Sequence, residues 1–260
     1  MPLNINIFLV FWACIISAVF RPIIGDFQEA GLNGVLAGGL GANYIVWFSL
    51  LIAFMSLRMI RELPPIWVFC IAIFMMLVPS ATLSWIGASL VAFWIVCHQP
   101  KNLAAILLLA ASLREPLTAI CLKLFAGNIL GFDAIMTNVA LLLMGQQPVI
   151  ESNIVISETG QPLLILTGCS VFANLSFISL LWLTMHVFFK RVITWGSWLL
   201  LGVVMFMTLA SNAFRLAFMT QSAQSYYYYH DGVGSQIFEW GLMLTVLLVM
   251  IGGCKYAKTS

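Results

Sequence analysis

Three side chains in the second half of the chain are of the types needed to attack a peptide carbonyl. Cys169 supplies a thiol, Arg215 a permanent cation, and His230 a group that titrates near neutral pH. A thiolate can act as the nucleophile, fixed cationic donors can stabilise an oxyanion, and an imidazole can protonate the leaving amine. This chemistry requires a fold that brings the three residues to one place.

The composition predicts that this fold lies in a membrane. Hydrophobic residues make up 62% of the chain, charged residues only 8%, and the mean hydropathy is +1.05. A soluble domain of this length could not cover its surface with so few polar groups. We therefore expect an all-α integral membrane protein, one multi-span domain over residues 1–260. Residues 1–113 would hold the amino-terminal spans and 114–260 the catalytic half.

Apolar runs separated by Gly, Pro and charged residues predict a polytopic bundle of about eight transmembrane helices. The first run has no basic lead-in, which favours a retained helix over a cleaved signal peptide. The predicted spans are residues 5–20, 42–57, 65–79, 81–97, 102–113, 170–189, 195–219 and 236–253.

The Lys and Arg residues predict a cytoplasmic amino terminus, because basic residues concentrate on the cytoplasmic side of a membrane. The net charge of +2 is small and the basic residues are scattered along the chain, so nucleic acid is not an expected partner. With eight alternating helices, seven basic residues lie inside and four lie outside or in the outer leaflet. The inner residues are Arg58, Arg61, Lys101, Lys190, Arg191, Lys255 and Lys258; the outer ones are Arg21, Arg114, Lys123 and Arg215.

Residues 114–167 are not predicted to span the membrane. The helical runs 117–125 and 134–144 are too short or too polar, and we expect them along the outer interface as amphipathic or half-inserted helices. Alternating apolar and polar residues over 148–166, with a break at Thr159-Gly160, predict a small β-hairpin outside the membrane. Its second strand leads directly into Cys169.

This topology places the three reactive residues on the extracytoplasmic side. Cys169 lies at a strand-to-helix junction, where free N–H groups and the helix dipole would stabilise a thiolate; the alternative is a buried small hydrophobe. Arg215 lies one turn inside the outer end of its span, and Asn212, three residues earlier, could orient it; the alternative is a snorkelling anchor. His230 precedes the last span, where a lone histidine is otherwise simply solvated.

Three motifs resemble the exosortase/archaeosortase family of membrane-embedded, transpeptidase-like cysteine enzymes. They are Thr167-Gly168-Cys169-Ser170, Asn212-x-x-Arg215 at the end of the next span, and His230 before the last span. The resemblance covers about residues 110–254. It implies that Cys169 is the nucleophile, Arg215 the transition-state stabiliser and His230 the proton carrier.

The resemblance also implies a substrate and a location. The substrates would be membrane-anchored precursor proteins whose carboxyl-terminal sorting signals combine a short motif, a helix and a basic tail. The enzyme would be a multi-pass protein of a bacterial inner membrane, linked to surface protein sorting and exopolysaccharide production, with its active site outside. Many exosortases have Glu-Ala-Cys-Ser-Gly with a further Arg downstream. Here Val171 follows Ser170 and the next basic residue is Lys190, which leaves the subfamily and the recognised motif open.

Two other functions are compatible with the composition. A transporter or channel would use Arg114, Glu115, Asp133 and Arg215 as intramembrane charges, but it predicts charges near the midplane and paired broken helices. A non-catalytic subunit of polysaccharide export predicts that Cys169 can be replaced without loss. No metal or organic cofactor is expected, since no cluster has ligand spacing. Whether water or an amine resolves the acyl-enzyme stays open.

Overall fold

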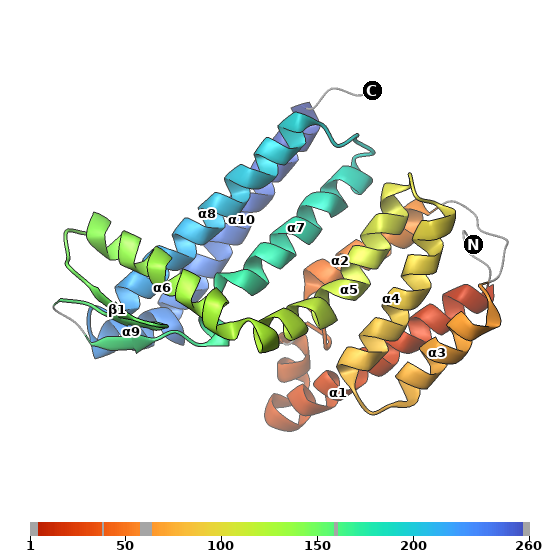
Figure 1. The fold of residues 1–260 in the computed structure, drawn as a ribbon, viewed down its shortest axis with the longest axis horizontal. Helices are drawn as coiled ribbons and strands as arrows, with labels where there is room; N and C mark the ends of the chain where they lie inside the picture. Colours follow the sequence, from red (N-terminus) through yellow and green to blue (C-terminus); the bar gives the residue numbers. More distant parts are fainter. Residues whose placement is uncertain (1–4, 38, 58–63, 159–160, 257–260) are drawn as a thin grey trace. The chain divides into compact units, whose positions relative to one another are not determined.

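The computed structural model describes residues 5–37, 39–57, 64–158 and 161–256, most of which are helical (Figure 1). The chain forms two compact units. The first comprises Met1–Ala119 with Leu180–Arg191, and the second comprises Ile120–Ser179 with Val192–Ser260. All three candidate catalytic residues belong to the second unit.

The first unit is a helical bundle in which α1, α3 and α4 pack on one another. Close approach of α3 and α4 depends on Gly87, where a Cβ would lie 3.1 Å from the carbonyl oxygen of Ala72 and 3.3 Å from the sulfur of Cys14. α1 contains a kink at Ala30 and Gly31, the latter with a φ of 61°. The helices of this unit are α1 (Ile5–Ala37), α2 (Tyr44–Ser56), α3 (Ile66–Leu77), α4 (Ala81–His98) and most of α5 (Leu103–Leu124).

The second unit is built around α8, which packs against α6, α9 and α10. α8 begins with a capping box, in which Thr194 and Ser197 bond each other's backbone N–H groups and so satisfy donors that a helix start leaves open. The helices of this unit are α6 (Ala126–Leu143), the first half of α7 (Val171–Phe188), α8 (Trp195–Met219), α9 (Ala223–His230) and α10 (Val233–Tyr256).

α6 crosses the end of α8 and does not run along its length. One buried cluster contains residues of both helices. Its members on α6 extend from Leu130 to Leu141, about 16 Å of helix, whereas its members on α8 extend only from Ala213 to Met219, about 9 Å. The ribbon shows the same crossing near the end of α8 next to the strands (Figure 1). α6 therefore forms a cover over the two helical turns that contain Asn212 and Arg215.

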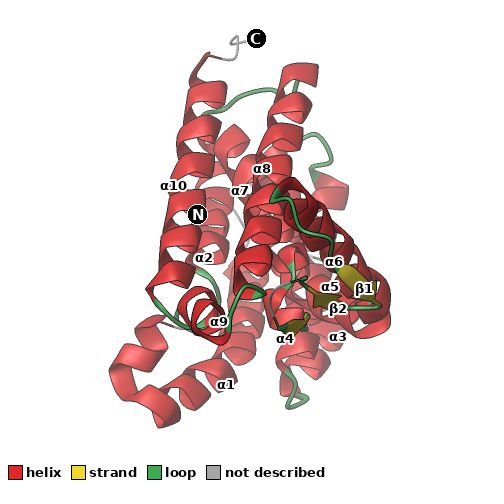
Figure 2. Cartoon of the chain, turned by 90° about the vertical axis from the view of Figure 1, so that its left-hand side faces the viewer, coloured by secondary structure: helices red, strands yellow, loops and turns green. Residues whose placement is uncertain are grey.

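A three-stranded antiparallel sheet lies against α6 (Figure 2). The strands are β1 (Val149–Glu151), β2 (Ile154–Ile156) and β3 (Pro162–Leu164), in the order β1-β2-β3. Val155 pairs with Leu163, and both are buried while their strand neighbours are not. The alternation expected for residues 148–166 is confirmed, but the element is a sheet of three strands and not a two-stranded hairpin. The predicted break at Thr159-Gly160 lies outside the described residues.

The extra strand pair results from a turn at Ser152-Asn153. Glu151 pairs with Ile154, so the two intervening residues form the whole loop, and Ser152 has a φ of 60°. A two-residue loop with a left-handed backbone is a typical hairpin connection, and Asn favours such turns. Asn153 also bonds Ile165 twice: its carbonyl accepts from Ile165 N at 2.9 Å, and its side chain donates to Ile165 O at 2.9 Å.

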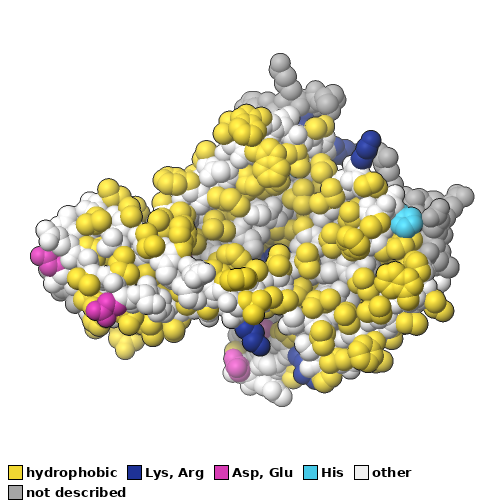
Figure 3. All heavy atoms as spheres, in the orientation of Figure 1, with side chains coloured by type: hydrophobic (Ala, Val, Ile, Leu, Met, Phe, Trp, Pro, Cys, Tyr) yellow, Lys and Arg dark blue, Asp and Glu magenta, His cyan; other side chains and the backbone are white. Residues whose placement is uncertain are grey.

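Seven described helices are long and apolar enough to cross a membrane: α1, α4, α5, α6, α7, α8 and α10. α2 and α3, which match the predicted spans 42–57 and 65–79, are shorter apolar helices of 13 and 12 residues. Hydrophobic side chains cover much of the face shown in Figure 3, and charged side chains lie at only a few points on it. The expected mainly helical architecture is thus present, with seven described helices of spanning length and composition where about eight spans were predicted.

Two predicted boundaries are wrong. The run 117–125 is not a separate helix, because α5 continues through Pro116 to Leu124. The run 134–144 forms part of α6, an 18-residue helix that is itself long enough to span. Pro116 lies inside α5, although a proline lacks the N–H that an interior helical turn uses. Arg58, Arg61 and Lys258, used to predict orientation, lie outside the described residues.

Candidate functional site

Cys169 occupies the junction between sheet and helix that the sequence predicts. β3 leads into a 3-10 turn over Thr167–Cys169, and α7 begins at Val171. The side chain of Asn212 on α8 donates a hydrogen bond to the carbonyl oxygen of Cys169 at 3.2 Å. Cys169 is 7% exposed and belongs to the buried cluster shared by α6, β2, β3 and α8. The nucleophile candidate is therefore fixed by its backbone, from both the sheet and α8.

The amino terminus of α7 does not offer its N–H groups to the thiol. The N–H of Val171 donates to a carboxylate oxygen of Asp133 on α6 at 3.3 Å, and the N–H of Phe172 donates to the hydroxyl of Ser170 at 3.2 Å. These partners cap the helix in the usual way. The N–H groups of Val171 and Phe172 are thus bonded to other groups than the thiol, and thiolate stabilisation by this helix start stays a prediction.

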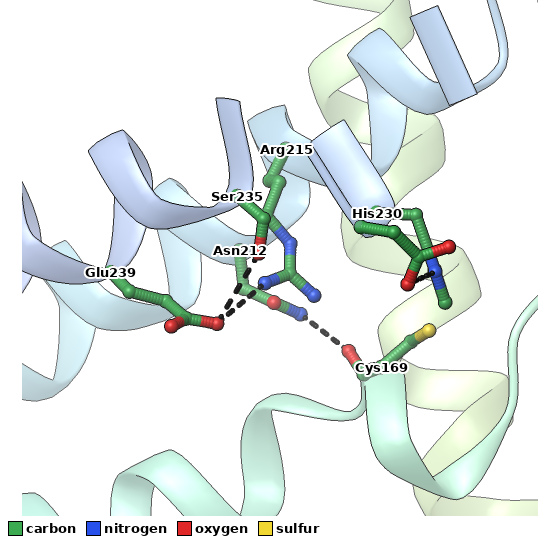
Figure 4. A network of polar contacts seen from close by, with 7 residues as sticks. Cys169, Asn212, Arg215, His230, Ser235 and Glu239 are labelled. Carbon is green, nitrogen blue, oxygen red and sulfur yellow. Dashed lines mark hydrogen bonds and ion pairs between the residues drawn. The ribbon is translucent and has the colours of Figure 1, made fainter. Parts of the chain in front are cut away.

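Arg215 lies one turn before the end of α8, and its guanidinium extends toward the Cys169 segment (Figure 4). Its side chain is 13% exposed, and its ion pair with Glu239 of α10 spans 3.7 Å. Glu239 is 66% exposed and also accepts a hydrogen bond from Ser235 at 3.4 Å. The Nε atom of Arg215 is buried and has no hydrogen-bond partner among the described residues. An ion pair of this length with an exposed carboxylate contributes little to stability. Donors of the Arg215 guanidinium therefore remain for another anion.

Asn212 acts differently from the expectation. It was predicted to orient Arg215, but its hydrogen bond goes to Cys169. Because residues three apart share one face of a helix, Asn212 and Arg215 both face the loop that contains the thiol. The Asn-x-x-Arg pattern therefore connects the nucleophile candidate to the cation through two adjacent side chains of α8.

His230 is the last residue of α9 and pairs with its neighbour Asp231. The Nδ1 atom of the imidazole lies 2.7 Å from a carboxylate oxygen of Asp231. Such a pair fixes the orientation of the ring and leaves Nε2 for a second partner. The ring of Tyr226, one turn earlier, stacks on His230 with centroids 5.0 Å apart. His230 is thus held on one edge and one face.

Tyr226 connects the imidazole to the thiol. It packs against the buried cluster that includes Cys169. Its pKa is raised, first by desolvation and then by the negative charges that Cys169, Asp231 and Tyr227 bear when ionised. Tyr226 therefore lies within electrostatic reach of Cys169 while it stacks on His230. In Figure 4 the thiol of Cys169 is turned toward the end of α9 that contains His230. The structure shows no hydrogen bond between this thiol and either His230 or Arg215, among the residues described.

Glycine allows α9 and α10 to meet at this corner. A Cβ on Gly232 would lie 2.8 Å from the carbonyl oxygen of Tyr228, and one on Gly234 would lie 2.5 Å from the Tyr228 ring. No other residue type fits at Gly232 without a backbone shift. The tight corner keeps His230 close to the first turns of α10, which contain Ser235 and Glu239.

Several residues at the site were missed in the sequence. Asp231 directly follows His230, and this adjacency was the available signal. Tyr226 was interpreted as part of an interfacial anchor over 226–229, although a ring four residues before a histidine lies on the same helix face. Glu239 gave no usable signal, because its partner Arg215 is far from it in sequence.

The arrangement brings a thiol, a guanidinium with free donors and an oriented imidazole to one end of the second unit. The described residues contain no group of three or more His, Cys, Asp or Glu side chains suited to holding a metal ion. A thiol, a guanidinium and an imidazole can together support nucleophilic and acid–base chemistry. No family model, no curated protein and no solved structure matches this chain.

Proposed function

We propose that this chain is a multi-pass membrane cysteine peptidase or transpeptidase of the exosortase type. The observation that supports the proposal best is the hydrogen bond from Asn212 to the carbonyl oxygen of Cys169, one turn from Arg215. It anchors the thiol segment to the helix that contains the cation.

The proposed membrane topology uses eight crossing helices: α1 to α5, α7, α8 and α10. α6 lies along the outer interface, which its crosswise packing on the last turns of α8 supports. The sheet, α9 and the reactive residues would then lie on the extracytoplasmic side of a bacterial inner membrane. The positive-inside distribution of Lys and Arg supports this orientation.

In the first half-reaction, the thiol proton of Cys169 passes to His230 and the sulfur attacks the scissile carbonyl. A C–S bond forms, and the carbonyl electron pair moves to oxygen, where donors of Arg215 stabilise the oxyanion. Collapse of this intermediate breaks the C–N bond, and His230 returns the proton to the leaving amine. Asp231 holds the imidazole during both transfers. The product is a thioester on Cys169.

In the second half-reaction, water or an amine attacks the thioester carbonyl. His230 takes a proton from the attacking group and then returns it to the departing thiolate, which restores Cys169. The substrates would be precursors anchored by a carboxyl-terminal helix with a basic tail, because a membrane-embedded thiol can reach only peptide bonds close to the bilayer surface.

The test compares native membranes from cells with the wild-type chain, Cys169→Ala, and Cys121→Ala. Cys121→Ala is a matched control, because Cys121 lies in α5 and is not part of the buried cluster that contains Cys169. Mass spectrometry of carboxyl-terminal peptides should show precursors that keep their final helix in Cys169→Ala cells and lose it in the other two. Immunoblots verify equal expression. Normal processing by Cys169→Ala would disprove the enzyme proposal.

A further inference from the structure

Asp133 of α6 is a buried carboxylate that lacks a full set of partners. It is 2% exposed; one oxygen accepts from the N–H of Val171 at 3.3 Å, with the hydroxyl of Ser170 close by. The other oxygen, Oδ2, is buried and makes no hydrogen bond within the described part of the chain. No Lys, Arg or His of the described ranges forms an ion pair with it. A buried charge is costly unless it is paired.

A cavity of about 270 Å³ adjoins this carboxylate, between the first turns of α6 and α7. Its polar lining consists of Asp133 and Asn128, while Ile129, Phe132, Phe172 and Leu175 provide most of the apolar wall. The cavity is slightly smaller than a typical small-molecule pocket of about 300–1,000 Å³. Its size suits a ligand with a small polar head group and one apolar chain segment. It is distinct from the Cys169, Arg215 and His230 site, since none of those residues lines it.

We infer that this cavity binds the primary ammonium group of an amphiphile. Once the Asp133 side chain turns to present Oδ2 to the cavity, an ammonium neutralises the carboxylate and supplies N–H donors for Oδ2 and for the side-chain oxygen of Asn128. The phenylalanine and leucine side chains take the first methylenes of the attached chain. A quaternary ammonium has no N–H, so the cavity should discriminate against choline-type heads.

The position of the cavity favours a ligand from the bilayer. It lies at the first turn of α7, an apolar helix of spanning length, and the ends of such helices lie at the level of lipid head groups. An aminophospholipid and a single-chain alkylamine share the required head. The inference does not depend on the peptidase proposal, because it uses neither the thiol nor the imidazole.

The test uses full-length protein in phosphatidylglycerol vesicles that contain a trace of photoreactive phosphatidylethanolamine, with the diazirine on the acyl chain and the amine free. Cross-links mapped by mass spectrometry should concentrate in residues 128–133 and 171–175. Phosphatidylcholine with the same diazirine chain should label these segments weakly. Dodecylamine should compete with the probe, and dodecanol should not.

Asp133→Asn is the central variant, because it keeps an oxygen for the N–H of Val171 while it removes the charge. Labelling should fall about tenfold or more, as expected when a charged hydrogen-bond partner is lost. Glu239→Gln removes an exposed carboxylate of the same unit and should leave labelling unchanged. Labelling of the same segments by a photoreactive alkylamine, without labelling by phosphatidylethanolamine, would assign the cavity to single-chain amines. Equal labelling by the two phospholipids, or unchanged labelling of Asp133→Asn, would overturn the inference.

Discussion

Arg215 illustrates how a single side chain can be held in place and still be available. Its helix position is rigid and its side chain is mostly buried, yet its ion pair with Glu239 is long and its Nε has no partner among the described residues. The sequence predicted the position, because an arginine near a span end is costly. It did not predict Glu239, because the pairing of α8 with α10 depends on tertiary packing.

Arg215→Lys should lower the rate of precursor processing by about 100-fold, the effect of losing an oriented oxyanion donor. Lysine keeps the charge but not the planar fork with several N–H groups. Quantitative immunoblots of a tagged precursor over time would measure the rate. Glu239→Gln should retain more activity than Arg215→Lys, because Glu239 is not proposed to face the oxyanion. A lysine variant with nearly wild-type rate would identify Arg215 as a snorkelling anchor.

Among the elements, the sheet is the one that determines where the nucleophile lies. Asn153 bonds both backbone groups of Ile165, and only three residues separate Ile165 from Cys169. The period-two pattern over 148–166 was enough to predict strands. The number of strands could not be predicted, because Ser152-Asn153 is a weak turn signal compared with Thr159-Gly160. A turn with a positive φ at serine is uncommon, and the structure was needed to identify it.

Ile165→Pro should impair processing more than Glu158→Pro. Proline at 165 removes the N–H that bonds Asn153 and leaves that carbonyl unsatisfied, a cost of about 1–3 kcal/mol. It also releases the segment before Cys169 from the sheet. Glu158 is exposed after β2, and a proline there removes one exposed hydrogen bond, which its carboxylate accepts from the N–H of Gln147 at 3.2 Å. The same precursor immunoblot measures both variants, and equal processing would show that β3 does not position the thiol.

For the whole molecule, the sequence predicted the membrane class and the all-α architecture from composition alone. It did not predict the length of α6 or the two-unit division, since hydropathy reports how apolar a helix is and not what it packs against. Length alone would make α6 a span, whereas its contacts with α8 favour a crosswise position. Orientation in the bilayer accordingly stays a prediction.

That orientation can be measured with single cysteines in a cysteine-free variant. Ser157, Cys169 and Cys254 are poor reporters because each is less than 8% exposed. Glu151→Cys on β1 and Trp195→Cys at the opposite end of α8 from Arg215 are exposed positions. A membrane-impermeant thiol reagent on intact cells should label Cys at 151 and not at 195. Labelling of both after permeabilisation is the control, and the reverse pattern in intact cells would invert the proposed topology.

The edges of the small sheet have a consequence for crowded membranes. Each strand has only three residues, and the described outer strands contain Pro162, which has no N–H, and the charged Glu151. Short edges with proline or charge are poor templates for strand addition by another molecule. Copies concentrated in one plane therefore have little opportunity to join through these strands. The sheet can hold the thiol segment in place without becoming a seed for aggregation.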